Sequence, residues 1–256
     1  MNQKFSANKK LGQHFLKDKK VILDILNSMP EATHSIMEIG PGPGAITDHL
    51  LTLDRKLLLI EKDQRFVEYW KQKNIDCLFL DALKADWDAV LNNYNLQHEK
   101  IWIVSNLPYN ISAPLTVNLM SISSFSTMTL MYQKEVAEKI LGTEGMCSLY
   151  ALAHAYFQVH KICLVKPGAF IPPPKVDSLV LLYQRLLQPK VSLMEFRRYE
   201  SFLRNLFAYP RKQLNSVLAK FMPTNWQEQC KVHDIDLTLR AEKLSWDQLL
   251  TLYSFF

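Results

Sequence analysis

The segment "NLPYNIS", residues 106–112, combines residue types that can hold the exocyclic amine of a nucleobase. The Asn106 carboxamide oxygen and the Leu107 backbone carbonyl can each accept one of the two amine hydrogens. Pro108 restricts Leu107 to an extended backbone, which fixes the direction of that carbonyl. Tyr109 can stack on the face of a base that has left its helix. The same order of residues is also compatible with a capped strand-to-helix turn that carries no chemistry.

A second candidate site is the glycine-rich loop "EIGPGPGAIT", residues 38–47. Gly40, Gly42 and Gly44 allow a sharp turn and a close backbone approach to a ligand. Pro41 and Pro43 lack the N–H groups that bind a pyrophosphate, so a ligand without phosphate fits this loop better than a dinucleotide does.

Two acidic residues follow the next two apolar runs. Glu61 ends "LLLIE", and Asp81 comes directly after "CLFL". At the strand ends of an open α/β sheet, an acidic side chain can bind ribose hydroxyls and other polar groups can reach the ligand crevice. With the glycine loop they favour a phosphate-free cofactor that contains adenosine, namely S-adenosylmethionine. The alternative is an ordinary turn, with each acid serving as a helix cap.

With that methyl donor, the chemistry of residues 106–109 becomes specific. The adenine amine is a weak nucleophile because its lone pair is delocalised into the ring, so it must be held in position. Positive charge disperses while a sulfonium methyl group is transferred, and catalysis then comes mainly from proximity and orientation. We therefore predict that Asn106, Leu107, Pro108 and Tyr109 are the catalytic residues.

Short apolar runs alternate with amphipathic stretches through the first two-thirds of the chain. This pattern predicts an α/β fold with a doubly wound, mostly parallel sheet of the Rossmann-like methyltransferase type. We expect strands at 36–39, 57–61, 77–80, 101–104 and 128–132, and a late hairpin-like addition from 161–170 and 177–186. After about Leu187 the periodicity is helical, which predicts a small all-α domain. We assign residues 1–20 to a basic N-terminal arm, 21–187 to the methyltransferase domain and 188–256 to a helical RNA-binding domain.

Basic residues concentrate in two stretches. Residues 1–20 contain six lysines against one aspartate, and residues 190–212 contain six basic residues against two glutamates. Such clusters suggest a polyanionic partner, although solvated faces would show the same pattern. Phe15 and Leu16 lie among the lysines of the arm, which suggests that this segment packs over the cofactor while its lysines face RNA. The RNA-binding candidates are Lys9, Lys10, Arg197, Arg198, Arg211 and Lys212.

Composition excludes several other classes. No apolar run approaches the length of a membrane span, and the N-terminus lacks the apolar stretch of a secretory signal, so we expect a cytoplasmic protein. The four cysteines are widely scattered, and no pair has metal-ligand spacing, so no metal site is predicted.

Several motifs together resemble one known family. The segments "LGQHFL" (11–16), "EIGPGPGAIT", "LDA" (80–82), "NLPYNIS" and "PPPKVDS" (172–178), with Glu61 between them, occur in the order found in the ribosomal RNA adenine N6-dimethyltransferases. Within that family the chain is most similar to the bacterial small-subunit enzymes. The resemblance covers nearly the full length, including "LRAEKLS" (239–245).

The resemblance implies a specific reaction and specific site residues. It implies that a monomer dimethylates two adjacent adenosines in a hairpin loop near the 3′ end of 16S rRNA, within a pre-30S particle and with S-adenosylmethionine as donor. Residues 106–109 would hold the target base. The predicted cofactor contacts are His14, Leu16, Gly40, Gly42, Glu61, Asp81 and Asn106.

Two departures from the family pattern concern RNA binding. Family members usually carry an Arg-Arg-Lys run where this chain has Pro210 before Arg211 and Lys212, and residues 142–153 lack the usual Tyr-Gly-Arg. Neither departure touches the predicted methyl-transfer residues.

The motifs fit four other classes of protein less well. An assembly factor without catalysis would not need both intact motifs, and a large-subunit methylase fits "PPPKVDS" and "LRAEKLS" less well. A DNA adenine methylase would more typically carry Asp in place of Asn106. The prolines of the glycine loop disfavour a nicotinamide dehydrogenase.

Overall fold

The computed structural model describes residues 5–256, which divide into two compact units. The first unit comprises the described residues up to Ala137 together with Gln158–Leu186. The second comprises Glu138–Phe157 and Leu187–Phe256. The second unit therefore includes residues 138–157, which lie within the range that the sequence assigns to the methyltransferase domain.

The first unit is built on a seven-stranded sheet with the strand order β4-β3-β2-β5-β6-β9-β7. Strands β2 to β6 are parallel to one another, and β9 pairs antiparallel with β6. This arrangement confirms the predicted doubly wound, mostly parallel sheet. The strands are β1 (Phe15–Leu16), β2 (Ser35–Ile39), β3 (Lys56–Glu61), β4 (Cys77–Phe79), β5 (Ile101–Asn106), β6 (Phe125–Gln133), β7 (Phe157–Val165), β8 (Phe170–Ile171) and β9 (Ser178–Arg185).

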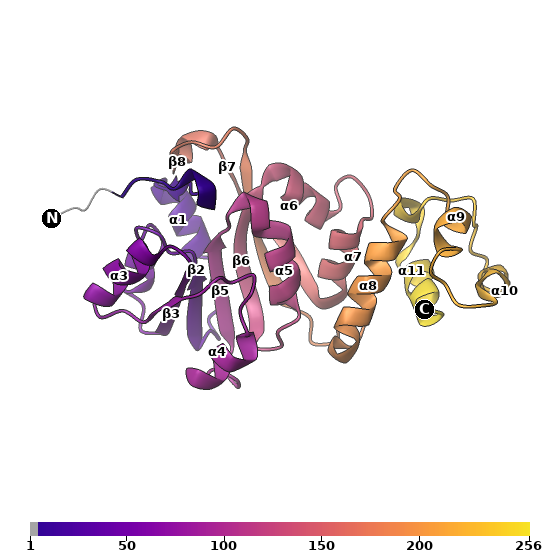
Figure 1. Cartoon of the computed structure of the whole chain (residues 1–256), viewed down its shortest axis with the longest axis horizontal. Coiled ribbons are helices and arrows are strands. Elements are labelled where there is room, and N and C mark those ends of the chain that lie inside the picture. Colours follow the sequence, from indigo (N-terminus) through magenta and orange to yellow (C-terminus); the bar gives the residue numbers. More distant parts are fainter. Residues whose placement is uncertain (1–4) are drawn as a thin grey trace. The chain divides into compact units, whose positions relative to one another are not determined.

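Helices cover both faces of this sheet (Figure 1). On one face, Val21, Ile22 and Ile25 of α1 pack in a core that includes Trp102 and Val104 of β5. On the other, Thr116 of α5 hydrogen-bonds to the Tyr132 hydroxyl of β6 at 2.8 Å, and Trp87 of α4 packs edge-on against Phe125. Burial on both faces explains why the strands are continuous apolar runs and do not alternate with polar residues. The helices of this part are α1 (Lys19–Leu26), α2 (Thr47–Leu50), α3 (Gln64–Gln72), α4 (Trp87–Asn93), α5 (Ser112–Met120) and α6 (Lys134–Leu141), the last of which reaches into the second unit.

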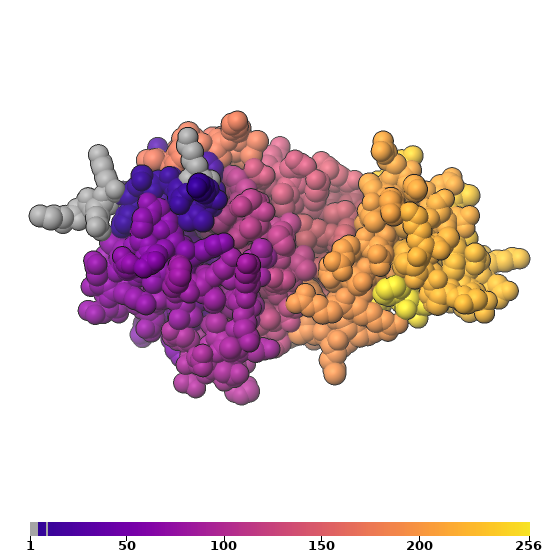
Figure 2. Space-filling model, viewed as in Figure 1, coloured from indigo at the N-terminus to yellow at the C-terminus, as the bar shows by residue number. Residues whose placement is uncertain are grey.

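The segment before α1 belongs to the fold of the first unit. Phe15 and Leu16 form β1, which pairs antiparallel with β8 through Ile171 and Phe170. The Lys17 N–H extends this pairing by donating to the Ala169 carbonyl at 2.8 Å. In Figure 2 the indigo N-terminal segment accordingly lies against the purple surface of the first unit.

The glycine loop between β2 and α2 is fixed by Trp70 of α3. The Trp70 indole Nε1 donates to the Gly42 carbonyl at 3.0 Å. Gly44 has a φ of +109°, and a Cβ at this position would come within 2.8 Å of the Trp70 ring. Both the backbone conformation and the close contact therefore require glycine at position 44.

The second unit is helical and has an aromatic core. Tyr156, Phe196, Tyr199, Phe202 and Tyr253 pack in a chain of ring contacts, with centroids 4.9–6.4 Å apart. This confirms the predicted helical C-terminal region. Its helices are α7 (Ser148–Tyr156), α8 (Phe196–Leu206), α9 (Leu214–Leu218), α10 (Trp226–Val232) and α11 (Trp246–Ser254), and short 3-10 turns are η4 (Leu193–Glu195) and η5 (Ala241–Lys243). Among residues 5–256, no helix is both long enough and apolar enough to cross a bilayer.

The packing of Gly44 can be tested by substitution. We expect Gly44→Ala to lower the free energy of unfolding by about 1–3 kcal/mol, because the new methyl group meets Trp70 and the left-handed backbone is strained. Gly168→Ala is the matched control, since a Cβ there has nothing within 4 Å, and it should change the free energy by no more than about 0.5 kcal/mol. Urea titration of both variants gives the comparison, and equal effects would contradict the assigned role of Trp70.

Candidate active site

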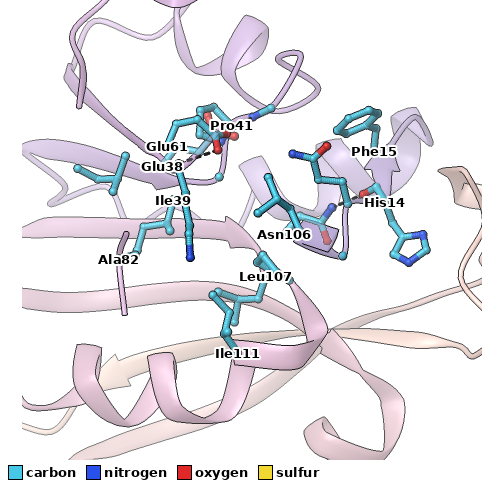
Figure 3. A pocket seen from close by; sticks show the side chains of 18 of the residues that line it. His14, Phe15, Glu38, Ile39, Pro41, Glu61, Ala82, Asn106, Leu107 and Ile111 are labelled. Atoms are coloured by element: carbon cyan, nitrogen blue, oxygen red, sulfur yellow. Dashed lines mark hydrogen bonds between the residues drawn. The ribbon is translucent and has the colours of Figure 1, made fainter. Parts of the chain in front are cut away.

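A pocket lies at the carboxyl ends of the parallel strands, where open α/β sheets bind their ligands (Figure 3). It is lined by the N-terminal segment, the glycine loop, the ends of β3, β4 and β5, and the start of α5. The structure thus brings the predicted catalytic and cofactor residues to one cavity: His14, Leu16, Gly40, Gly42, Glu61, Asp81, Asn106, Leu107, Pro108 and Tyr109 all line it.

Glu61 at the end of β3 is held by backbone donors. Its Oε2 accepts from the Gly42 N–H at 3.1 Å, and its Oε1 accepts from the N–H groups of Lys62 and Asp63, both at 2.8 Å. Burial raises the pKa of the Glu61 carboxyl, and these three N–H bonds oppose that rise because they favour the charged form. The bonds also fix the position of the carboxylate beneath the glycine loop.

Asp81 follows β4 and faces Lys62. The Lys62 Nζ lies 2.7 Å from Asp81 Oδ2, and the Leu83 N–H donates to Asp81 Oδ1 at 3.1 Å. The hydrogen bond from Lys62 lowers the pKa of Asp81. Asp81 is therefore an ionised acceptor at the rim of the pocket, with its charge balanced by a neighbouring lysine.

The Asn106 side chain has a defined orientation. Its Nδ2 donates to the backbone carbonyl of His14 at 2.8 Å, as the dashed line in Figure 3 shows. A carbonyl can only accept, so the amide group that faces His14 must be the NH₂. Within residues 5–256, no group donates to Asn106 Oδ1, which leaves this oxygen free to accept from a ligand.

The aromatic ring of the motif is also fixed. The Tyr109 hydroxyl lies 2.7 Å from the Ser178 Oγ at the start of β9. Burial raises the pKa of Tyr109, so the phenol stays neutral at physiological pH. Leu107 is almost fully buried, at 2% exposure, and Pro108 has the extended ψ of 124° before the turn η2 (Tyr109–Ile111).

Glu38, which was not predicted as a site residue, also lines the pocket. Glu38 lies within β2, is 2% exposed, and its Oε2 accepts from the Thr47 hydroxyl at 2.7 Å. Burial raises its pKa to about 8. The available signal was an acidic residue inside the otherwise apolar run "IMEI", because a charged residue is seldom buried without a reason.

A hydrogen-bond network beside the pocket was also not predicted. The Gln13 Nε2 donates to Asp63 Oδ2 at 2.9 Å, and Arg65 forms an ion pair with the same carboxylate. The Arg65 guanidinium also donates to the Ser6 carbonyl at 3.1 Å. Asp63 therefore joins the N-terminal segment to the start of α3.

The RNA-binding candidates fall in different places. Lys10 lines the edge of the pocket, and the side chain of Lys9 lies outside the described part of the chain. The other four candidates belong to the second unit and are exposed: Arg197, Arg198, Arg211 and Lys212. Three of them already have partners: Arg198 pairs with Glu195 at 3.4 Å, the Lys212 ammonium lies 5.1 Å from the Tyr209 ring centroid, and the Arg197 guanidinium lies 6.0 Å from the Phe196 ring centroid.

The doubly wound sheet, the glycine loop at its switch point and the acidic residue at the end of β3 define a fold of the S-adenosylmethionine-dependent methyltransferase class. Solved structures support this class. A dimethyladenosine transferase from Plasmodium falciparum matches with a TM-score of 0.76 at 25% identity, over 93% of this chain and 96% of that one. The 23S rRNA methyltransferase ErmE matches with a TM-score of 0.70 at 23% identity, over 94% and 98%, and shows the shared fold.

Comparison with protein families narrows the class. Residues 4–256 match the family described as ribosomal RNA adenine dimethylase. A ribosomal RNA small subunit methyltransferase A from Bdellovibrio bacteriovorus is 35% identical over 98% of this chain and 93% of that protein. One of the same description from Lawsonia intracellularis is 35% identical over 96% and 92%. The chain belongs to the ribosomal RNA adenine dimethylase family, which confirms the resemblance and the enzyme class predicted from the sequence.

The orientation of the Asn106 amide leads to a first prediction for the site. Asn106→Asp places a carboxylate oxygen against the His14 carbonyl, and two acceptors repel each other. This repulsion raises the pKa of the new carboxyl, so the variant should lose stability relative to the wild type as pH rises from about 4 to 8. Thermal unfolding across that range measures the effect, with the exposed Asn93→Asp as control. A pH-independent difference would mean that the NH₂ does not face His14.

The raised pKa of the buried Glu38 carboxyl can be tested through the pH dependence of stability. Because its folded-state pKa is about 8 and its unfolded value is near 4.3, the neutral carboxyl is compatible with the fold and ionisation opposes folding. The wild type should therefore lose stability relative to Glu38→Gln as pH rises from about 5 to 9, by up to a few kcal/mol, and the two should be similar below pH 5. Urea titrations at several pH values give the curve. A constant difference between the two proteins would show that Glu38 titrates normally.

Proposed function

We propose that this protein transfers methyl groups from S-adenosylmethionine to N6 of two adjacent adenosines in a hairpin loop near the 3′ end of 16S rRNA. The substrate is a pre-30S particle, and the enzyme acts as a monomer. The observation that carries the proposal is the free Oδ1 of Asn106, which sits at the end of β5 in the same pocket as Glu61. The small-subunit description of the relatives supports the choice of 16S rRNA.

The residues of the pocket fit the proposed cofactor. Gly40 lines the cavity, and a Cβ built there meets nothing within 4 Å, so a side chain would occupy the ligand space itself. Glu61 offers a fixed carboxylate for the ribose hydroxyls, and Asp81 offers an ionised acceptor for the adenine amine. Leu16 and Ile39 add apolar walls. When bound, the cofactor supplies an electrophilic methyl group on a sulfonium sulfur.

The residues of the "NLPY" motif fit the target base. The Asn106 Oδ1 and the Leu107 carbonyl accept the two N6 hydrogens, which turns the nitrogen lone pair toward the methyl donor. The Tyr109 face supports the ring by stacking. Its hydroxyl is engaged with Ser178 at 2.7 Å and has no part in proton transfer.

The chain contributes orientation and not acid–base chemistry. The N6 proton becomes acidic only after the nitrogen has gained the methyl group, and water can then remove it. The pocket therefore needs acceptors that hold the nitrogen, and a strong base is not required. A second methylation can use only one of the two acceptors, because a single N6 hydrogen remains after the first.

The basic residues of both ends of the chain support an RNA substrate. Arg211 and Lys212 are exposed in the second unit. The stretch around them, residues 201–227, contains no Asp or Glu. We propose that they contact phosphates together with Lys9, Lys10, Arg197 and Arg198. A ribosomal substrate also fits the cytoplasmic location expected from the sequence, which stays a prediction.

The proposed reaction can be tested on ribosomal particles. Small subunits from cells that lack this modification should gain two adjacent dimethyladenosines when incubated with the protein and S-adenosylmethionine. Asn106→Ala should reduce the rate by at least about 100-fold because the amine loses its oriented acceptor, whereas Asn93→Ala should not. Mass spectrometry of 16S rRNA fragments measures the products. Methylation at another site, or none by the wild type, would refute the proposal.

Cofactor binding can be tested separately. Glu61→Gln removes the charge and also places an NH₂ group against one of the backbone N–H donors that hold the carboxylate. It should weaken S-adenosylmethionine binding by about 1–3 kcal/mol, since charged hydrogen bonds to the ribose are lost. Glu68→Gln, an exposed change on α3, is the control. Calorimetric titration gives both affinities, and an unchanged affinity in Glu61→Gln would remove Glu61 from the proposed cofactor site.

A further inference from the structure

Two aromatic rings lie face to face at the edge of the pocket. The His14 imidazole and the Tyr109 phenol have centroids 5.6 Å apart and an interplanar angle of 25°. Both residues line the cavity, and both are partly exposed. A nearly parallel pair of rings at a pocket entrance is an arrangement that can receive a third flat ring.

Each ring is hydrogen-bonded to the same proline-rich segment. The His14 Nδ1 lies 2.8 Å from the Pro172 carbonyl, so this nitrogen must carry the proton and donate. The Tyr109 hydroxyl lies 2.7 Å from the Ser178 Oγ. The two bonds hold the rings from residues 172 and 178, which begin and end the "PPPKVDS" motif.

The His14 ring is directed away from the proposed cofactor side. In Figure 3 the imidazole points away from Glu61 and Pro41, on the opposite side of Asn106. The main chain of His14 contacts the Asn106 amide, at 2.8 Å. The backbone and the side chain of His14 therefore serve different neighbours.

We propose that the target adenine binds between the His14 and Tyr109 rings, so that the His14 side chain contacts RNA and not the cofactor. This inference rests on the proposed function. Stacked atoms approach to about 3.5 Å, so a base between two rings needs about 7 Å. The two rings, whose centroids are 5.6 Å apart, must then move apart to admit the base. The adenine amine would lie beside Asn106, because residues 106–109 are contiguous.

The proposed base position between the His14 and Tyr109 rings also gives a role to the proline-rich segment, residues 172–178. A segment with three consecutive prolines has little backbone freedom, so its Pro172 carbonyl and the Ser178 hydroxyl form a stiff frame for both rings. Without the frame, each ring could rotate into solvent, and ordering it again would reduce the binding free energy.

The test separates the ring of His14 from its hydrogen bond. His14→Phe keeps a flat ring but cannot donate to Pro172, and His14→Gln can donate but has no ring. The exposed His160→Ala on β7 is the matched control. For each variant, steady-state kinetics with unmethylated small subunits gives kcat and KM for the particle, and calorimetry gives the Kd for S-adenosylmethionine.

The expected result is specific. His14→Gln should lower kcat/KM for the particle by about 5- to 150-fold, the loss of one stacked base, while the Kd for S-adenosylmethionine changes less than about twofold. His14→Phe should keep a higher kcat/KM than His14→Gln, and it should lose only what the bond to Pro172 contributes. With a hairpin RNA that carries 2-aminopurine at the target position, the wild type and His14→Phe should quench its fluorescence more than His14→Gln does.

Four outcomes would overturn the inference, and the last of them would also refute the proposed function. A weaker Kd for S-adenosylmethionine with an unchanged particle KM would assign the ring to the cofactor. Retained activity in His14→Gln with loss in His14→Phe would show that only the bond to Pro172 matters. If both variants match the wild type, His14 does not contact the base, and the proposed function stands; a wild type that methylates no adenosine would instead refute both.

Discussion

The hydrogen bond from Asn106 to the His14 carbonyl is the interaction on which the site depends. It joins residues 92 positions apart and sets which atom of the amide faces the ligand. Its geometry requires that the segment around His14 be fixed, and the pairing of β1 with β8 and the Gln13–Asp63 bond fix it. An N-terminal segment outside the seven-stranded sheet thus determines how the end of β5 can act.

The N-terminal segment around His14 also connects the proposed base position to the proposed cofactor position. Gln13 contacts Asp63, whose backbone N–H binds Glu61, and Glu61 in turn accepts from the Gly42 N–H. A displacement at one end of this series would move acceptors at the other, because each member holds the next by a short hydrogen bond. The proposed cofactor and base positions are therefore defined by one continuous network.

The sequence was sufficient to predict the sheet and most of the pocket for a physical reason. Buried parallel strands are continuous apolar runs, and polar residues at their ends converge on one edge, so Glu61, Asp81 and Asn106 could be placed together. Contacts between distant segments carry no local signal. The pairing of β1 with β8 and the stacking of His14 on Tyr109 depend on tertiary packing and could not be inferred.

Charge balance in the pocket suits a cationic ligand. Glu38 has a pKa of about 8, so burial keeps it largely neutral at physiological pH, and Asp81 is neutralised by Lys62 at 2.7 Å. Asp63 is likewise paired with Arg65.

Glu61 differs from these carboxylates, because its partners are backbone N–H groups, which carry no net charge. A bound sulfonium donor would carry one positive charge, and the ionised form of Glu61 would attract it, while the paired carboxylates of Asp81 and Asp63 would contribute little. Loss of that positive charge after methyl transfer would weaken the attraction to Glu61.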